Sequence, residues 1–283
     1  MKATGVIFEE PAVKTEKDGQ KGARYTNEVC KKLDPENYLI DGRPVGFPVV
    51  VADASMLMNA FLVDAAIAQD IIKDSGFRVV ELFPGKAILQ LLFVDYREND
   101  LGNYNEGAIL FPVITPGERK PFPFFGALKR MATGSAGNFV YRMPVDQEFT
   151  THAGRYIWGF PKWVAKIDIA FGEKRATGSF FDEGELVYSL AAKAGGTSNA
   201  KEQRAASLAI REGKAWKTYG TNIGSGVTFS LGGEMPDIGE NHPLALELRE
   251  LGLPKKPIFT VSIKNTSMTF SGPESVEIGQ PFR

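Results

Sequence analysis

Cysteine and histidine are scarce in this chain of 283 residues. Cys30 is the only cysteine, which excludes an intrachain disulfide and any zinc site built from several cysteines. The two histidines, His152 and His242, are too few for a zinc site with three histidine ligands, and they leave only two candidate bases for a Ser-His-Asp triad. We therefore expect no bound metal, and most triad chemistry is removed before any motif is considered.

An excess of charge of one sign and long apolar runs are also missing. Lys plus Arg is 33 and Asp plus Glu is 34, so the formal net charge is −1, which argues against a dedicated nucleic-acid binder. No stretch approaches the roughly 18 uncharged apolar residues of a membrane span. Residues 1–22 carry acidic side chains where a signal peptide needs an apolar core. We expect a cytoplasmic protein with neither a nucleic-acid nor a membrane partner.

The beginning of the chain differs in character from the rest. Residues 1–25 are charged and glycine-rich with little periodicity, which is typical of an N-terminal arm. From residue 26 to residue 283 no linker of low complexity and no internal repeat interrupts the sequence. We therefore predict an arm over residues 1–25 and a single domain over residues 26–283.

The strongest helical pattern follows a short β-branched run. Residues 48–51 predict a strand. Between residues 56 and 72 apolar side chains recur at spacings of three and four, which predicts a helix that ends near Gly76. Asp53 and Ser55 are the candidate N-caps of that helix.

Most of the remaining chain reads as short strands separated by glycine and proline turns. We predict strands over residues 77–83, 87–96, 106–114, 138–144, 164–171, 175–181, 185–192, 214–219, 227–231, 257–264 and 267–271. A loop is expected over residues 115–137, a short surface helix over 194–207, and a helix over 243–251 with proline at its start and Gly252 at its end. The predicted fold class is α+β, mostly β: an antiparallel sheet or β-barrel with a few covering helices.

One segment, residues 154–163, places a lysine among aromatic side chains. Lys162 directly follows the pair Phe160-Pro161, with Trp158 and Trp163 close in sequence. A lysine amine normally carries a proton at neutral pH, and burial in apolar surroundings opposes that charged form. A neutral amine can attack a ketone and form a Schiff base. Alternatively, the lysine stem lies over the aromatic surface while its head reaches water, which is the commoner arrangement.

Several motifs in the same order resemble the acetoacetate decarboxylase family. A Gly-Arg pair at residues 154–155 is followed, after five intervening residues, by a Pro-Lys pair at residues 161–162. A second motif, Tyr104-x-Glu106, is followed by the small residue Gly107. Upstream, Arg43 comes five residues after Tyr38, and near the end Phe-x-Gly-Pro occupies residues 270–273. The resemblance extends from about residue 38 to the end of the sequence.

The resemblance implies a Schiff-base lyase that decarboxylates a β-keto acid such as acetoacetate to a ketone and carbon dioxide. Lys162 would be the nucleophile, and Glu106 would position groups near the amine or manage a proton. Arg43 would bind an anionic substrate group or Glu106, while Met143 and Phe160 would form apolar walls. The family needs no metal or organic cofactor. Its partners would be a small keto acid and further copies of the same chain in a homo-oligomer.

Two positions depart from the pattern of the family decarboxylase. Trp163 stands where that enzyme has a second lysine, so burial alone is left to lower the pKa of Lys162. Leu91 stands where it has a further glutamate, so the resemblance implies that Trp163 and Leu91 are substrate-binding residues in a less polar pocket. These changes keep two alternatives open: an aldolase or dehydratase of the same fold acting on an oxo acid, and a non-catalytic protein that binds a small apolar ligand.

Overall fold

The computed structural model describes residues 29–115, 118 and 137–276. The predicted arm and nearly all of the predicted loop at 115–137 lie outside these residues. The chain is mostly β, as predicted, and three sheets organise it. The longest strands belong to one large sheet: β4 (Val49–Asp64), β7 (Lys86–Asn99), β8 (Tyr104–Ile114), β9 (Gly137–Val145), β15 (Gln203–Arg211), β16 (Lys214–Leu231) and β18 (Phe259–Phe270).

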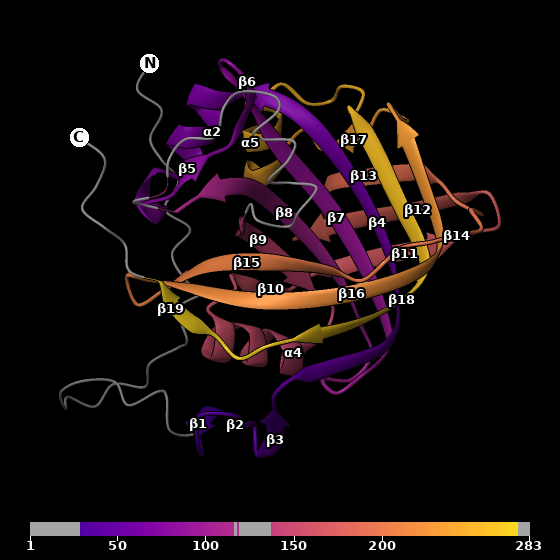
Figure 1. The fold of residues 1–283 in the computed structure, drawn as a ribbon. Coiled ribbons are helices and arrows are strands. Elements are labelled where there is room, and N and C mark those ends of the chain that lie inside the picture. Colours follow the sequence, from indigo (N-terminus) through magenta and orange to yellow (C-terminus); the bar gives the residue numbers. More distant parts are fainter. Residues whose placement is uncertain (1–28, 116–117, 119–136, 277–283) are drawn as a thin grey trace.

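The large sheet curls into a ring (Figure 1). Its order runs β9-β15-β16-β18-β4-β7-β8, and β8 pairs in turn with β9, which closes the path. The pairing of β15 with β9 is parallel, and the other neighbours in the ring are antiparallel. Shorter strands pair along the ring: β5 (Arg78–Val79), β6 (Glu81–Phe83), β10 (Lys162–Val164), β14 (Ser198–Asn199) and β19 (Glu274–Val276).

Two smaller sheets and a few short helices complete the described structure. One sheet contains β11 (Lys166–Phe171), β12 (Arg175–Asp182), β13 (Glu185–Lys193) and β17 (Asp237–Ile238), and the other contains β1 (Cys30–Lys32), β2 (Asn37–Ile40) and β3 (Arg43–Gly46). The helical segments are α2 (Ala65–Ile71), η1 (Lys73–Ser75), α4 (Glu148–Ala153), η2 (Gly154–Trp158) and α5 (Pro243–Glu250). Figure 1 shows α4 at the opposite end of the molecule from α2 and α5.

The helix predicted over residues 56–76 is wrong in its first half and confirmed in its second half, where α2 and η1 lie. Its first half continues strand β4 as far as Asp64, and the side chain of Asp64 then caps α2 by accepting from the backbone N–H groups of Ala66 and Ile67. Strand β4 pairs with β7 on one edge and β18 on the other, and apolar side chains lie on both of its faces. A strand buried on both faces can show spacings of three and four by coincidence. Gly76 does end a helical turn, η1, with a φ of 72°.

The residues proposed as caps of that helix have other partners. Asp53 accepts two hydrogen bonds from the guanidinium of Arg97, each 2.7 Å long. The hydroxyl of Ser55 donates to the backbone oxygen of Lys264 at 2.6 Å. Both contacts tie neighbouring strands together, so these side chains stabilise the sheet.

Other boundaries also changed. The surface helix predicted over residues 194–207 is wrong: β14 and most of β15 lie there, paired with β16. The two strands predicted at 214–219 and 227–231 are one strand, β16, and those at 257–264 and 267–271 are one strand, β18, which bulges after Ile263. The helix predicted at 243–251 is confirmed as α5.

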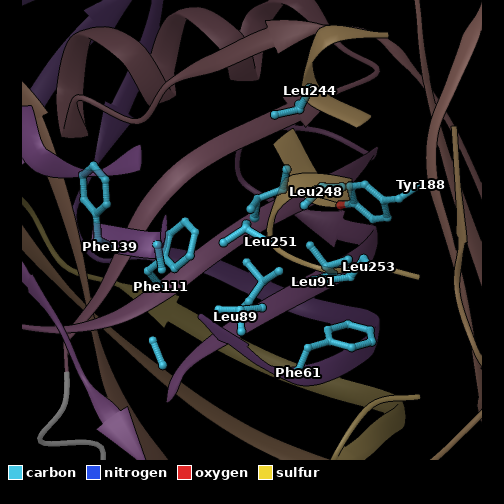
Figure 2. Close-up of a cluster of buried hydrophobic side chains, with 14 of the residues drawn as sticks. Phe61, Leu89, Leu91, Phe111, Phe139, Tyr188, Leu244, Leu248, Leu251 and Leu253 are labelled. Carbon is cyan, nitrogen blue, oxygen red and sulfur yellow. The ribbon is translucent and has the colours of Figure 1, made fainter. Parts of the chain in front are cut away.

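The principal hydrophobic cluster joins the ring to the four-stranded sheet and to α5. Figure 2 shows leucines of α5 lying over side chains of β4, β7 and β8. The members labelled there are Phe61, Leu89, Leu91, Phe111, Phe139, Tyr188, Leu244, Leu248, Leu251 and Leu253. This cluster covers one face of β7 and β8. The other face of these two strands carries the candidate site.

Candidate active site

Strand β9 lies between the two groups that sequence analysis singled out. Lys162 begins β10, which runs parallel to β9 with Lys162 opposite Met143. Glu106 lies on β8, which runs antiparallel along the other edge of β9, opposite Val145. Because the two positions on β9 are two residues apart, their side chains lie on the same face of the sheet. Residues 56 positions apart in sequence are thereby brought together.

A helical segment that the sequence analysis did not predict covers this face. The side chain of Gln147 caps α4 by accepting from the backbone N–H of Thr150 at 3.1 Å. The helix continues into η2, a π-helical turn that ends at Gly159, whose φ of 76° favours glycine. Turns of this type inside helices are frequent at functional sites. The chain then reverses and enters β10 at Lys162.

Gly154, the glycine of the Gly-Arg motif, makes room for the lysine stem. A Cβ atom placed on Gly154 would lie 2.5 Å from Cδ and 2.9 Å from Cε of Lys162. Such distances are too short for any side chain at this position unless the lysine moves. The spacing between this glycine and the lysine therefore has a packing reason, since only glycine lets the stem lie against the helix.

The amine of Lys162 and the carboxylate of Glu106 form a buried ion pair. Nζ of Lys162 lies 2.8 Å from Oε2 of Glu106, and these two residues are only 4% and 5% exposed. Nζ also donates to the hydroxyl of Thr150 at 3.1 Å, and it lies 5.0 Å from the centre of the Tyr104 ring. Thr150 is completely buried.

Two opposing effects act on the protonation of Lys162. Burial is the largest single influence and disfavours the ammonium form, but the Glu106 carboxylate and the Tyr104 side chain together favour it more strongly, so the pKa of Lys162 lies above its ordinary value. The expectation that burial alone would lower this pKa is therefore wrong for the resting site. That expectation left out the carboxylate of Glu106 and the side chain of Tyr104, which together outweigh the loss of water around the amine.

Two buried tyrosines complete the polar cluster. The hydroxyl of Tyr96 donates to Oε1 of Glu106 at 3.3 Å, so each carboxylate oxygen has its own partner. Burial raises the pKa of Tyr96 well above its usual value, and the charge of Glu106 raises it further. Burial also raises the pKa of Tyr104, although the ammonium of Lys162 opposes this. Both phenols therefore keep their protons at neutral pH and are available as donors.

Apolar side chains border the ion pair. Met143 is buried opposite Lys162, and the half-buried ring of Phe160 packs against the same cluster. That cluster also contains Leu92, Ala108, Leu110 and Val140. The structure thus brings Met143 and Phe160 together with Lys162, as the resemblance implied.

Trp163 and Leu91 lie on the opposite face. Trp163 follows Lys162 in a strand, so its side chain points the other way; its indole N–H donates to Asp182 at 3.0 Å. Leu91 is completely buried in the principal cluster, where Figure 2 shows it near Leu251. Neither residue is placed with Lys162. Leu92, the neighbour of Leu91, instead packs with Met143 and Phe160.

Arg43 lies at the outer side of α4. Its exposed guanidinium stacks over the ring of Phe149, with 3.9 Å between Cζ and the ring centre. Phe149 directly precedes Thr150, so Arg43 contacts the helix that covers the ion pair. No contact between Arg43 and Lys162 is seen within the part of the chain that the structure describes.

The remaining elements of the resemblance support the same helical segment. The indole N–H of Trp158, in η2, donates to the backbone oxygen of Ser271 at 2.9 Å. The ring of Phe47 packs against Trp158 and Tyr38, with ring centres 5.7 Å apart in both cases. A Cβ atom placed on Gly272 would lie 2.9 Å from the Phe47 ring, so Gly272 lies close against that ring. The Phe-x-Gly-Pro element at 270–273 therefore braces the turn that precedes the lysine.

Sequence reasoning missed three residues of the polar cluster. Tyr104 lies two residues before Glu106 in a strand and so shares its face, a signal that the sequence did contain. Thr150 lies four residues before Gly154, which places both on one side of a helix. Tyr96 had no local signal, because its contact with Glu106 depends on the pairing of β7 with β8.

Within the described residues, no group of three His, Cys, Asp or Glu side chains could hold a metal ion. In the same part of the chain, no helix is long and apolar enough to cross a membrane.

Comparisons with known proteins extend this picture. A family model described as "Acetoacetate decarboxylase (ADC)" matches residues 41–222. A comparison with curated protein sequences gave no significant match.

Solved structures share the fold at low sequence identity. Acetoacetate decarboxylase from Legionella pneumophila subsp. pneumophila str. Philadelphia 1 aligns with a TM-score of 0.61 at 16% identity, over 93% of this chain and 98% of that chain. The enduracididine biosynthesis enzyme MppR complexed with pyruvate aligns with a TM-score of 0.56 at 14% identity, over 83% of this chain and 92% of that one. MppR complexed with the condensation product of pyruvate and imidazole 4-carboxaldehyde aligns with a TM-score of 0.51 at 13% identity, over 82% of this chain and 90% of that chain.

Proposed function

Because this chain belongs to the acetoacetate decarboxylase family, we propose that it is a Schiff-base lyase that decarboxylates a β-keto acid such as acetoacetate. The observation that carries the proposal is the buried contact of 2.8 Å between Nζ of Lys162 and Oε2 of Glu106. A lysine is rarely buried without a specific reason, and here the buried amine has a carboxylate that can take its proton.

The pair can supply a neutral amine without exchange with water. Transfer of one proton from Nζ to Oε2 converts the ion pair into an uncharged pair. Because the pKa of Lys162 is raised, the ion pair is the resting form, and the uncharged pair is the minor form from which the amine reacts. The free electron pair on Nζ can then attack the keto carbon of the substrate. The substrate oxygen receives one proton from the attacking nitrogen and one from Glu106, and it leaves as water when the iminium forms.

The iminium then provides the driving force for decarboxylation. Its positive nitrogen accepts the electron pair of the bond to the carboxylate carbon, so carbon dioxide leaves and an enamine remains. Protonation of the enamine carbon followed by hydrolysis releases the ketone and restores the Lys162 amine. Met143 and Phe160 would keep water away from the enamine, and Arg43 would bind an anionic group of substrate as it enters.

Chemical trapping tests the proposal. Borohydride reduction in the presence of acetoacetate should attach the substrate carbons to the peptide that contains Lys162, and carbon dioxide should be released without borohydride. The variant Lys162→Arg keeps a cation beside Glu106, so we expect it to fold while trapping is lost. Mass spectrometry of the digested protein and a thermal melt provide the measurements. Equal trapping by this variant would identify another lysine as the nucleophile.

A second candidate function is aldol condensation or dehydration on an oxo acid by the same lysine. The observation in its favour is the structural likeness to MppR, whose complexes contain pyruvate and a condensation product of pyruvate. Consumption of pyruvate together with an aldehyde, without carbon dioxide release from acetoacetate, would select this reaction. Absence of any adduct with keto acids, together with tight binding of an apolar ligand, would leave a non-catalytic binding protein.

A further inference from the structure

The hydroxyl of Thr150 is the second hydrogen-bond partner of the Lys162 amine. It accepts from Nζ at 3.1 Å and is completely buried. Thr150 lies in the first turn of α4, where its backbone N–H is already bonded to the capping side chain of Gln147. Its position is therefore fixed by the helix cap as well as by the amine. No motif of the family resemblance includes this residue.

The helix holds the lysine at two points four residues apart. The stem lies against Gly154, where a Cβ would come within 2.5 Å of Cδ, and the amine lies against Thr150. Positions four apart share one side of a helix, so the stem follows the helix surface from one residue to the other. The stem is thus restrained near its middle by the helix, and its end is restrained by the Thr150 hydroxyl together with Glu106.

The geometry around Nζ gives this hydroxyl a specific task. A neutral amine has two N–H bonds and one lone pair, and the direction of the lone pair depends on rotation about the Cε–Nζ bond. Glu106 lies 2.8 Å from Nζ and takes up a proton when the amine becomes neutral. An N–H bond that stays on Thr150 restricts this rotation and so limits the directions that the lone pair can take.

We propose that Thr150 is a positioning residue that orients the neutral Lys162 amine for attack on the keto carbon. This inference rests on the proposed Schiff-base function. Orientation of this kind matters because a displacement of about 1 Å in a reacting group can lower a rate by roughly a hundredfold. Thr150 touches the nucleophile without itself exchanging a proton or forming a bond with substrate.

The neighbouring residue offers a matched control. Thr151 is also buried in α4, but its hydroxyl donates to the backbone oxygen of Gln147 at 3.1 Å and not to the lysine. Thr150→Val and Thr151→Val therefore remove the same atom from adjacent positions. Thr150→Ser keeps a hydroxyl at the first position and serves as the rescue variant.

Borohydride trapping with saturating acetoacetate is the first measurement. We expect the rate for Thr150→Val to fall by about tenfold to a hundredfold, while Thr150→Ser and Thr151→Val stay within about threefold of the wild type. The concentration of acetoacetate that gives half the maximal rate should change little. A trapping rate for Thr150→Val equal to that of the wild type would overturn the inference. So would equal losses of trapping rate in Thr150→Val and Thr151→Val that parallel the falls in their melting temperatures.

A measurement without substrate separates this inference from the proposed function. Acetylation of Lys162 by acetic anhydride, followed across neutral and alkaline pH by mass spectrometry, reports how readily the amine becomes neutral. Loss of the Thr150 acceptor removes a partner of the ammonium, so the midpoint should move to lower pH in Thr150→Val and not in Thr151→Val. If no keto acid gives a borohydride-reduced adduct with the wild type, the proposed function fails. If the midpoint of Lys162 acetylation is also unchanged in Thr150→Val, the contact between Thr150 and the amine is rejected as well.

Discussion

At the scale of single residues, the Lys162–Glu106 pair determines how the site responds to pH. The ordinary lysine pKa is near 10.4, and in this site it is raised. The protonated lysine therefore stabilises the fold at all pH values below its ordinary pKa, and this contribution is lost as the pH rises through the higher, folded-state pKa. The pair should thus cause no loss of stability between neutral pH and pH values near 10.

Glu106→Gln should reverse this behaviour. Without the carboxylate, burial is opposed only by the smaller effect of Tyr104, so the folded-state pKa of Lys162 should fall below the unfolded value. The unfolded chain then binds more protons between the two pKa values, so stability should rise with pH in that window. At neutral pH we expect a loss of roughly 3–5 kcal/mol in the free energy of unfolding, because a buried ammonium loses its partner.

Urea denaturation of Glu106→Gln at several pH values checks this expectation. The double variant Glu106→Gln with Lys162→Met is the control, because it lacks the ammonium and should show no rise with pH. A single variant whose stability falls between neutral and mildly alkaline pH would contradict the assigned effect of burial.

At the scale of elements, the helical segment α4–η2 is built around the lysine stem. Gly154→Ala should strengthen the helix, since alanine is favoured over glycine there by about 1 kcal/mol and the φ of −60° suits any residue. The added Cβ nevertheless falls on Cδ of Lys162 and must displace the stem. We expect a native melting temperature with trapping reduced by about tenfold or more.

Ala153→Gly is the matched control for that substitution. It introduces the helix cost of glycine at the adjacent buried position without adding an atom near Lys162. Its stability should fall by about 1 kcal/mol while trapping per folded molecule is unchanged. Circular dichroism and peptide mapping after borohydride reduction measure both. Normal trapping in Gly154→Ala would show that the lysine stem has free space that the structure does not contain.

The elements also show how far the sequence could predict the structure. The lysine is marked by its aromatic neighbours in sequence, and the resemblance to the family singles out the glutamate and the glycine of the Gly-Arg motif. The structure brings all three together. The part of β4 over residues 56–64 was mistaken for a helix because its two faces pack in different hydrophobic clusters, and periodicity reports neither this packing nor the pairing with β7 and β18. Tyr96 was missed for the same reason, since strand pairing sets its contact with Glu106.

At the scale of the whole molecule, adjacent residues of β7 serve two different regions. Leu91 belongs to the cluster between the ring and α5, whereas Leu92 packs beside Met143 and Phe160. Leu91→Ala should lower the free energy of unfolding by about 2–5 kcal/mol, because it leaves a cavity in the core. Trapping per folded molecule should be preserved, since its side chain faces away from Lys162.

Leu92→Ala provides the comparison. Because Leu92 is only half-buried, this substitution should lower the free energy of unfolding by less than Leu91→Ala does. It changes the wall beside Phe160, so it should alter the rates of trapping for keto acids of different chain length. Denaturant melts and trapping with a short and a long keto acid distinguish the two variants. Altered trapping in Leu91→Ala with unchanged stability would place Leu91 in the substrate pocket after all.

The position of β9 between the two reacting groups makes the site a local part of the sheet. Lys162 and Glu106 approach each other once β9 has joined β8 on one side and β10 on the other, and these three strands follow one another along the chain. The ring also needs the pairing of β4 with β18, whose residues lie far apart in sequence, and contacts between distant parts of a chain form slowly. A refolding sample should therefore regain its ability to form the adduct no later than the slowest rise in its native signal.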